Sequence, residues 1–285
     1  MQIRGRRPDR PPLRCHCRRK HHPGELVNLL ITGITTRSSI AYAVAEEAMK
    51  QGHQVVLSNP PGRQPSILER IARRLPAEPV DILGLDVTDP DQITAAAEAV
   101  ADHWDHVDGL LHSIAYAPAT ALGGGFLDTS WEDAATAIHI SGYSLKALAV
   151  GFRGLLAAAP DGAGIVSLTF DASRAWPVYD WMGSAKAVLE NSTKYLARDL
   201  GGDGIRVNTV SAGPIKSLAG GSIPGFDRIA DRWAESAPAG WDTTDATVVA
   251  GPALFLMSPA ARAITGTTLH VDGGYHAMGA PITAG

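Results

Sequence analysis

A tyrosine and a lysine seven residues apart, in the segment YDWMGSAK (179–186), form the pair in this sequence best suited to chemistry. Seven residues are two turns of an α-helix, a rotation of roughly 700°, so both side chains leave the same face about 20° apart. A phenol can donate a hydrogen bond to an oxygen that gains negative charge, and an ammonium group can hold hydroxyl groups. Tyr179 and Lys186 therefore predict a site on one helix face. The alternative is a core-facing tyrosine and a solvated lysine.

That helix needs a scaffold, and the rest of the chain predicts alternating strands and helices. Short apolar runs that end at glycine or polar residues alternate with segments of helical spacing. We expect strands at 27–33, 53–59, 80–89, 107–115, 164–170, 206–213 and 267–274, and helices at 38–52, 66–75, 91–104, 131–159 (with internal breaks), 183–200 and 245–257. A polar, glycine-rich stretch runs to about residue 240. This alternation predicts an α/β fold: a Rossmann-like, doubly wound parallel sheet of about seven strands in a single domain.

The ends of these strands carry the second signal. In a doubly wound sheet, ligands bind at the carboxyl ends of the strands, beside the switch point. The first turn offers Gly33 for a tight bend and Ser39 at a helix N-terminus, where backbone N–H groups favour a phosphate. That turn alone is a poor GxGxxG match, and an ordinary turn with a serine cap explains it better. The later ends are Asp86-Val87, His112-Ser113-Ile114-Ala115, Ser211–Ile215 and Val271–Gly274. Each of these groups, taken singly, marks only the end of a strand, but together they predict a dinucleotide site.

Composition separates a basic head from an acidic body. Residues 1–22 carry eight Lys/Arg and one Asp, a charge of +7. Since the net charge of the whole chain is −4, the remaining residues carry a charge of −11. We expect residues 1–24 to be a disordered tail and residues 25–285 to form the folded domain. The tail lacks the apolar region of a secretory signal, and no apolar run in the chain reaches the roughly 20 residues needed to cross a membrane. Its Cys15 and Cys17 leave a metal clip open as an alternative, and the body contains no cysteine. These features favour a cytoplasmic protein without disulfides.

On these residues, the sequence resembles the enoyl-acyl-carrier-protein reductases of the short-chain dehydrogenase superfamily, over residues 27–279. Its most specific blocks are FDASRAWPVYDWMGSAKAVLE (170–190), AGPIKSLA (212–219) and VDGGYHAMG (271–279). It is similar to actinobacterial members, including mycobacterial ones. The resemblance implies that Tyr179 is the catalytic tyrosine, Lys186 the ribose-binding lysine and Phe170 a second active-site aromatic. The implied cofactor contacts are Gly33, Ser39, Ile40, Asp86, Val87, Ser113, Ile114, Ala115, Ile140, Lys186, Gly213, Pro214 and Ile215.

The resemblance also suggests why the tyrosine and lysine stand seven apart. A carbonyl reductase adds hydride to the carbon that bears the oxygen, so its acid stands beside the nicotinamide. An enoyl thioester accepts hydride at C3, while negative charge develops on the oxygen attached to C1. Our hypothesis is that Tyr179 moves outward to that oxygen while Lys186 stays on the ribose, without a change of helix face. The lysine and the oxidised nicotinamide would lower the pKa of the tyrosine.

The implied activity is NADH-dependent reduction of trans-2-enoyl thioesters in type II fatty-acid biosynthesis. The implied partners are the acyl carrier protein as substrate carrier and three further copies of the chain in a homotetramer, with no nucleic acid and no membrane. Triclosan-like phenols are expected inhibitors. A segment at 216–241 is expected to cover a short-to-medium acyl chain. Two alternatives remain open: a related dehydrogenase acting on another carbonyl or enone, and a dinucleotide sensor without turnover.

One departure from the family pattern bears on these expectations. After the second strand, Asn59-Pro60-Pro61-Gly62-Arg63 replaces a phenylalanine of mycobacterial members, which leaves only Arg63 to stack on adenine. A single basic residue there favours NADH over NADPH. His112, His270 and His276 have no metal-binding spacing, so no metal site is expected.

Overall fold

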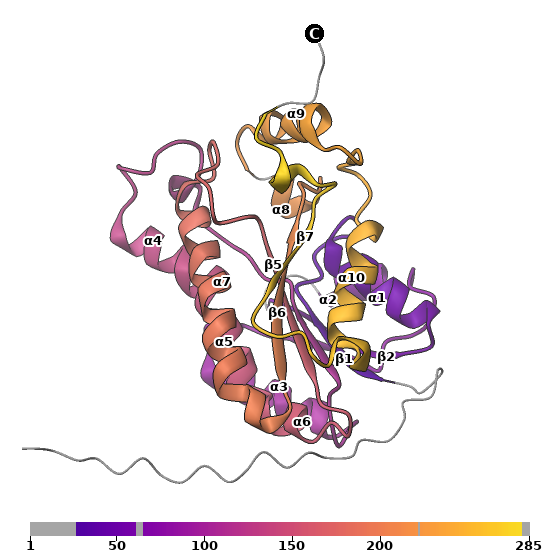
Figure 1. The fold of residues 1–285 in the computed structure, drawn as a ribbon. Helices are drawn as coiled ribbons and strands as arrows, with labels where there is room; N and C mark the ends of the chain where they lie inside the picture. The colour runs from indigo at the N-terminus through magenta and orange to yellow at the C-terminus, as the bar shows by residue number, and fades with distance from the viewer. Residues whose placement is uncertain (1–26, 61–64, 222, 281–285) are drawn as a thin grey trace, which may run out of the picture.

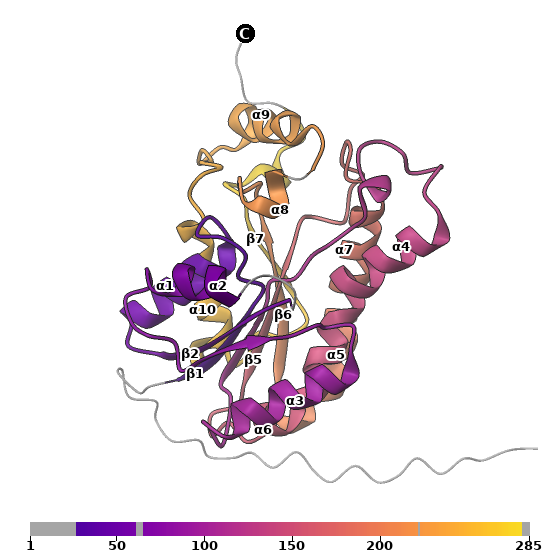
Figure 2. The ribbon, with the colours of Figure 1, turned by 180° about the vertical axis from the view of Figure 1, so that it is seen from behind.

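The computed structural model describes residues 27–60, 65–221 and 223–280, which form one parallel sheet with helices on both faces (Figures 1 and 2). The strand order is β3-β2-β1-β4-β5-β6-β7, and every neighbouring pair is parallel. The strands are β1 (Asn28–Thr32), β2 (Gln54–Asn59), β3 (Asp81–Gly84), β4 (Gly109–His112), β5 (Gly164–Thr169), β6 (Arg206–Ala212) and β7 (Thr268–Val271). The order reverses between β1 and β4, so the expected doubly wound sheet is confirmed.

Helices cover both faces of the sheet. In chain order the α-helices are α1 (Ile40–Lys50), α2 (Pro65–Ala72), α3 (Pro90–Ala101), α4 (Trp131–Ile138), α5 (Ser144–Gly151), α6 (Arg153–Ala157), α7 (Asp180–Leu200), α8 (Leu218–Gly221), α9 (Phe226–Ser236) and α10 (Thr247–Met257). One face carries α1, α2 and α10, and the other carries α3, α5 and α7 (Figures 1 and 2). Among the described residues, no helix is both long and apolar enough to span a membrane.

The strands supply side chains to two cores. In β1, Leu29 and Ile31 pack with α1 and α10, while Leu30 packs with α3 and α5 on the opposite face. This alternation follows from the two-residue repeat of a strand. All three side chains are at most 2% exposed, so β1 is buried on both sides. Burial on both faces explains the continuous apolar run, which is typical of parallel sheets.

The expected long helix at 131–159 is broken, as the sequence predicted. A π-helical segment, η2 (His139–Tyr143), separates α4 from α5, and α6 follows after Phe152. Gly142 lies in η2, where a Cβ atom would stand 2.8 Å from the backbone oxygen of Ala185 in α7. Glycine therefore lets this irregular segment approach the helix that carries Tyr179 and Lys186 closely.

Three sequence expectations about the elements need correction. The stretch before residue 240 contains α8 and α9. In α9, Phe226, Ile229 and Trp233 form a buried stripe at helical spacing, but the polar residues around them make this spacing hard to recognise in the sequence. Strand β3 ends at Gly84, two residues before Asp86, and β7 ends at Val271. Helix α7 begins at Asp180 rather than 183. The expected tail at 1–24 lies outside the described residues.

Candidate active site

Tyr179 and Lys186 lie on the same helix at the carboxyl end of β5, and both are buried. Tyr179 precedes α7 directly and is 6% exposed; Lys186 is two turns further along and is 5% exposed. The Lys186 Nζ atom donates a hydrogen bond to the backbone oxygen of Leu168 in β5 at 2.8 Å. The ring of Phe170 packs edge-on against Tyr179, with ring centres 5.3 Å apart. The structure thus brings together the three residues expected to be catalytic, and the solvated-lysine alternative is wrong.

Burial sets the protonation of this pair. Desolvation, followed by the nearby Glu190 carboxylate, raises the pKa of Tyr179 above its usual range. Desolvation lowers the pKa of Lys186 to about 8, and Glu190 opposes this change. The expected lowering of the tyrosine pKa is therefore wrong, because burial raises this pKa and the Glu190 carboxylate adds to the rise. Tyr179 is a neutral hydrogen-bond donor at neutral pH.

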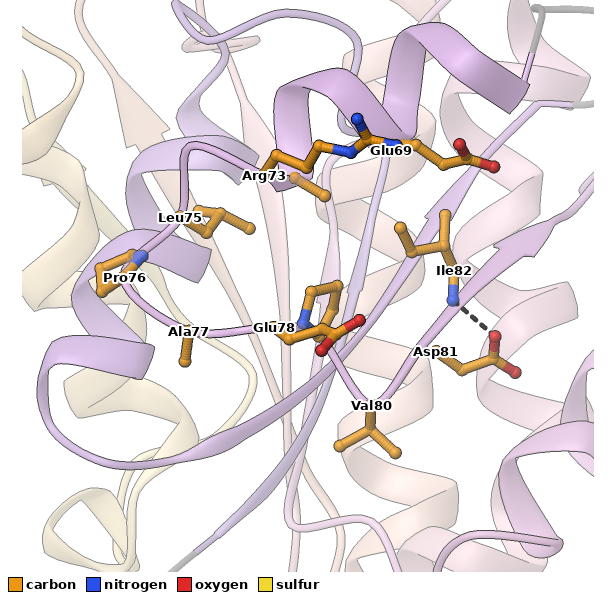
Figure 3. A pocket seen from close by; sticks show the side chains of 11 residues that line it. Glu69, Arg73, Leu75, Pro76, Ala77, Glu78, Val80, Asp81 and Ile82 are labelled. Carbon is orange, nitrogen blue, oxygen red and sulfur yellow. Dashed lines mark hydrogen bonds between the residues drawn. The ribbon is translucent and has the colours of Figure 1, made fainter.

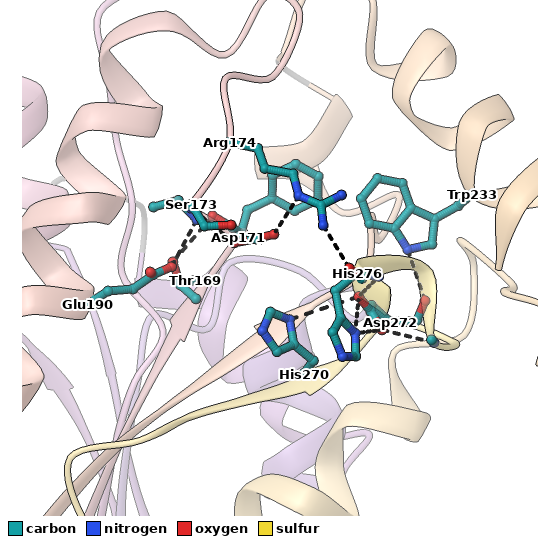
Figure 4. Close-up of polar contacts among 12 residues, drawn as sticks. Thr169, Asp171, Ser173, Arg174, Glu190, Trp233, His270, Asp272 and His276 are labelled. Carbon is teal, nitrogen blue, oxygen red and sulfur yellow. Dashed lines mark hydrogen bonds and ion pairs between the residues drawn. The ribbon is translucent and has the colours of Figure 1, made fainter. Parts of the chain in front are cut away.

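Glu190 is a site residue that the sequence reasoning missed. Its Oε1 atom accepts hydrogen bonds from Thr169 Oγ1 at 2.8 Å and from the backbone nitrogen of Ala172 at 3.1 Å. These bonds tie α7 to the end of β5 beside Phe170 (Figure 4). The signal was present in the sequence, since Glu190 follows Lys186 by four residues and so shares its helix face.

The backbone around Tyr179 adopts an uncommon conformation. Val178 and Asp180, which flank it, have φ angles of 60° and 41°, the two positive values found at non-glycine residues in the described chain. A loop before α4 holds both: Gly123 N donates to the Val178 oxygen at 2.9 Å, and Gly124 N donates to Asp180 Oδ2 at 2.5 Å. Positive φ is unfavourable for a β-branched residue, so these contacts fix the tyrosine against a local preference.

The first turn has the geometry expected of a dinucleotide site. Gly33 has a φ of 81°, and a Cβ atom there would collide with the backbone oxygen of Ser113. Only glycine lets the ends of β1 and β4 come this close. Ser39 caps α1 by accepting from Tyr42 N at 3.3 Å, and its hydroxyl donates to the Thr36 oxygen at 2.7 Å. The serine-cap interpretation is therefore confirmed, and a phosphate contact of Ser39 stays a prediction.

Most of the other predicted cofactor contacts lie at or just beyond the carboxyl ends of the strands, whereas Ile40 begins α1 and Ile140 lies in η2. Asp86 is oriented by Thr88, whose backbone nitrogen and hydroxyl donate to Asp86 Oδ1 at 2.9 and 2.6 Å. Gly213 N donates to the Val271 oxygen at 2.9 Å, so the ends of β6 and β7 also meet. Val87 and Ile215 are buried, Ala115 is exposed, and Ile40, Ser113, Ile114 and Ile140 are intermediate; Pro214 accepts a hydrogen bond from Trp241 Nε1.

Asn59 ends β2 with a buried acceptor. Its side chain is 6% exposed, and its Oδ1 atom has no hydrogen-bond partner in the described part of the chain. An acceptor just after the second strand is where a Rossmann fold binds the ribose 2′-hydroxyl of NAD. Arg63, expected to cover adenine, lies outside the described residues.

The segment expected to cover the substrate meets the site through aromatic rings. Trp233 of α9 is 2% exposed, stacks on Tyr275 with ring centres 3.8 Å apart, and contacts Phe170 at 5.3 Å. Trp176 lies between them, 4.8 Å from Phe170 and 5.2 Å from Trp233. We call Phe170, Trp176, Trp233 and Tyr275 the aromatic cluster. It joins Tyr179 to α9.

A surface groove lies elsewhere, at the outer edge of the sheet (Figure 3). The end of α2 and the start of β3 line it, including Glu69, Arg73 and Asp81. It is therefore at the amino end of an edge strand, whereas the predicted site residues gather at the carboxyl ends. Its position gives it no part in the arrangement around Tyr179.

Comparison with known proteins agrees with this geometry. A family model described as enoyl-(acyl carrier protein) reductase matches residues 33–276. The chain belongs to this family. It is 36% identical to an NADH-dependent enoyl-acyl-carrier-protein reductase of Mycolicibacterium smegmatis, over 86% of this chain and 94% of that relative. It is 40% identical to the corresponding Rickettsia felis protein and 37% identical to that of Aquifex aeolicus, each over 88% of this chain and 94% and 91% of those relatives. The family resemblance predicted from the sequence is confirmed.

Proposed function

We propose that this protein is an NADH-dependent reductase of trans-2-enoyl thioesters carried on acyl carrier protein. The observation that carries the proposal is the buried pair of Tyr179 and Lys186, seven residues apart at the start of α7. The pair lies at the carboxyl end of β5. Relatives that are 36–40% identical over most of their length carry the same activity in their names. A different carbonyl substrate is less well supported, because the relatives' names specify enoyl thioesters on acyl carrier protein. A sensor without turnover is also less well supported, because a sensor has no need of a buried catalytic phenol.

Tyr179 has the protonation that the reaction requires. Because burial keeps its hydroxyl protonated, it can donate a hydrogen bond to the thioester oxygen as negative charge develops there. Such a contact typically contributes about 3 kcal/mol to the transition state. The strained backbone at Val178 and Asp180 holds the hydroxyl in one place, which favours a preorganised donor.

Lys186 is the residue that would hold the nicotinamide ribose. In the ligand-free protein its Nζ atom donates to the Leu168 oxygen at 2.8 Å, which uses one of its three donors. The remaining donors suit ribose hydroxyls beside β5. When bound, NADH supplies the hydride that reaches C3 of the enoyl group; the role of the chain is to position ribose, thioester and proton donor.

The residues at the strand ends fit a dinucleotide. Gly33 removes the Cβ atom that would fill the turn before α1, and Asn59 Oδ1 is a buried acceptor in need of a donor. A ribose 2′-hydroxyl supplies such a donor, whereas the 2′-phosphate of NADPH supplies none unless protonated. Gly33 fits either dinucleotide, and the Asn59 acceptor favours NADH. Asp86, oriented by Thr88, remains available to accept from the adenine amino group.

The aromatic cluster favours short-to-medium acyl chains. The rings of Phe170, Trp176 and Tyr275 pack between Tyr179 and Trp233 of α9, in the region that the segment 216–241 is expected to cover. A long chain would have to displace them, and each methylene left in water forfeits about 0.8 kcal/mol. Lys216 and Arg228 are exposed within the segment 216–241 and would meet the acidic carrier protein.

We also propose a homotetramer that acts in the cytoplasm; such an assembly would account for a further feature of the surface. Tyr143, Val150 and Tyr195 are 46–54% exposed on α5, α7 and the segment η2 before α5. These elements lie on one side of the sheet (Figure 1), where a second copy could cover them. The molecular mass in dilute solution, measured by light scattering, would test this assembly.

A direct assay tests the enzymatic proposal. Purified protein, NADH and a 2-enoyl thioester are mixed, and oxidation of NADH is followed by its near-ultraviolet absorbance. We expect turnover that is faster with NADH than with NADPH and that reaches a plateau of kcat/KM at medium chain length on carrier protein. Turnover of carbonyl substrates alone would favour the first alternative, and binding of NADH without any turnover would favour the sensor.

A further inference from the structure

Two histidines and one aspartate meet at the carboxyl end of β7, outside the catalytic arrangement (Figure 4). His270 belongs to β7, Asp272 follows the strand directly, and His276 lies in the short helix η5 (Tyr275–Ala277). One ligand-type atom from each residue lies within 4.8 Å of those of the other two. The sequence assigned these histidines no chemistry, because their spacing matches no metal motif.

A glycine turn brings the two histidines together. Gly273 and Gly274 have φ angles of 67° and 84°, values that fold the chain back toward β7. This reversal places the His276 ring over the His270 ring, with ring centres 4.0 Å apart and planes 14° apart. The juxtaposition depends on a left-handed turn, which a search for linear motifs cannot detect.

The carboxylate between them is held in place by its own turn. Asp272 is 5% exposed; its Oδ1 accepts from Gly274 N and its Oδ2 from His276 N, both at 2.9 Å. The Nδ1 atom of His276 lies 3.0 and 3.1 Å from the two carboxylate oxygens. The nearby Arg174 directs its guanidinium to the backbone oxygen of His276, at 2.7 Å.

His270 contributes a nitrogen that lacks a hydrogen bond. Its Nδ1 atom is buried, has no hydrogen-bond partner among the described residues, and lies 4.0 Å from Asp272 Oδ2. A buried polar atom without a hydrogen bond is costly, so a group that satisfies it would be stabilised. A divalent cation bound by all three side chains would use this nitrogen.

We propose that His270, Asp272 and His276 bind a divalent transition metal ion of the zinc type. Two imidazole nitrogens and one carboxylate oxygen are ligands that zinc accepts, with a fourth position left for water. Ligand atoms around a tetrahedral zinc ion are about 3.3 Å apart, given zinc–ligand distances of about 2.0–2.1 Å. The observed nitrogen–oxygen separations of 3.0, 3.1 and 4.0 Å bracket this value.

Binding requires one local change. A metal ion lies in the plane of each imidazole that binds it, so the stacked rings must turn relative to one another. Both rings are partly exposed, with side-chain exposures of 27% for His270 and 38% for His276, so they have room to turn. The carboxylate stays in place because backbone donors fix it.

Zinc binding to the full chain tests the site, in the absence of NADH and substrate, so its outcome is independent of the proposed enzymatic function. The parent carries Cys15→Ser and Cys17→Ser and no affinity tag, which removes competing thiols. Equilibrium dialysis against zinc chloride gives the zinc bound per chain. The test variant adds His270→Asn and His276→Asn. The matched control adds His103→Asn and His106→Asn, two histidines that each contact a carboxylate elsewhere.

We expect the parent and the control to bind one more zinc equivalent than the test variant. Saturating zinc should raise the Tm of the parent and the control by roughly 5 °C, and that of the test variant much less. Equal stoichiometry in parent and test variant, or no bound zinc in the parent, would overturn the proposal. If the double variant fails to fold in EDTA, His276→Asn alone should weaken zinc affinity at least tenfold, and unchanged affinity would equally overturn the proposal.

Discussion

Helix α7 and the cover segment at 216–241 contribute to the same site, but they are held in different ways. Lys186 and Glu190 attach α7 to the backbone and side chains of β5, and the loop at Gly123 and Gly124 fixes the residues beside Tyr179. Helix α9 instead meets the site through Trp233, which stacks on Tyr275 and donates from Nε1 to the Asp272 oxygen at 3.1 Å. One region is anchored by hydrogen bonds to the sheet, the other mainly by aromatic packing.

This difference separates catalysis from selection. The hydrogen bond of Lys186 to β5 and the loop contacts beside Tyr179 leave both residues little freedom, which suits their proposed roles as cofactor clamp and preorganised proton donor. Ring contacts are less directional, so α9 can shift to admit an acyl chain at modest cost. We expect changes in the anchored region to alter rate or cofactor affinity, and changes in the cover to alter stability and chain-length preference.

The largest expected effect is that of Tyr179→Phe. It removes the hydroxyl that we propose contacts the developing charge and keeps the ring that packs on Phe170, so turnover should fall roughly 100-fold, corresponding to about 3 kcal/mol. NADH affinity, measured by fluorescence titration, should change little. Full activity of this variant on a 2-enoyl thioester would contradict the assigned role of Tyr179.

Removing the central ring of the cover should act on stability first. Trp233→Ala deletes a side chain that is 2% exposed, and we expect it to lower the free energy of unfolding by about 3 kcal/mol. The same variant should shift the optimum of kcat/KM toward longer acyl chains. The matched control is Trp131→Ala, since Trp131 is 70% exposed and its loss should change stability by at most about 0.5 kcal/mol. Equal losses in the two variants, in denaturant titrations, would argue against a packing role of Trp233.

A third prediction concerns Lys186 and pH. Lys186→Met should weaken NADH binding roughly tenfold, with a smaller effect on turnover at saturating NADH. In the ligand-free protein the pKa of Lys186 is lowered to about 8, and contact with the cofactor favours the protonated form. The affinity is therefore complete below about pH 8 and is lost as pH rises through that value. Binding isotherms between pH 6.5 and roughly pH 9.5 would show this loss in the parent; the same loss in Lys186→Met would exclude Lys186 as its cause.

Most of the fold followed from local sequence patterns. The strands were found within a few residues of their ends, because strands buried on both faces read as continuous apolar runs and are closed by glycine or polar residues. Helix α9 was not predicted, because its stripe of Phe226, Ile229 and Trp233 is visible only when the partners of those residues are known. Those partners, Phe170, Trp176 and Tyr275, come from distant parts of the chain.

The site likewise contains features that local sequence predicts and features that depend on distant contacts. The seven-residue spacing predicted a shared helix face for Tyr179 and Lys186, because helix geometry is local. The direction of the tyrosine pKa could not be predicted, since it depends on how completely the fold excludes water. The cluster of His270, Asp272 and His276 was also not predicted, because it forms only when two glycines adopt left-handed conformations.

The smallest expected effect tests the strain beside Tyr179. Val178 has a φ of 60°, which costs a β-branched residue about 1–3 kcal/mol, whereas glycine adopts this angle freely. Val178→Gly recovers that cost but loses about 0.5–1 kcal/mol through the greater freedom of the unfolded chain, so stability should stay constant or rise by up to about 2.5 kcal/mol. In the control Val150→Gly, the exposed valine of α5 has no strain to release, and stability should fall by about 0.5 kcal/mol. Turnover of Val178→Gly should nevertheless decrease, because Tyr179 is held less firmly. A loss of stability equal to that of Val150→Gly would mean that the conformation beside the tyrosine stores no strain, and that the contacts from Gly123 and Gly124 alone account for the fixed position of Tyr179.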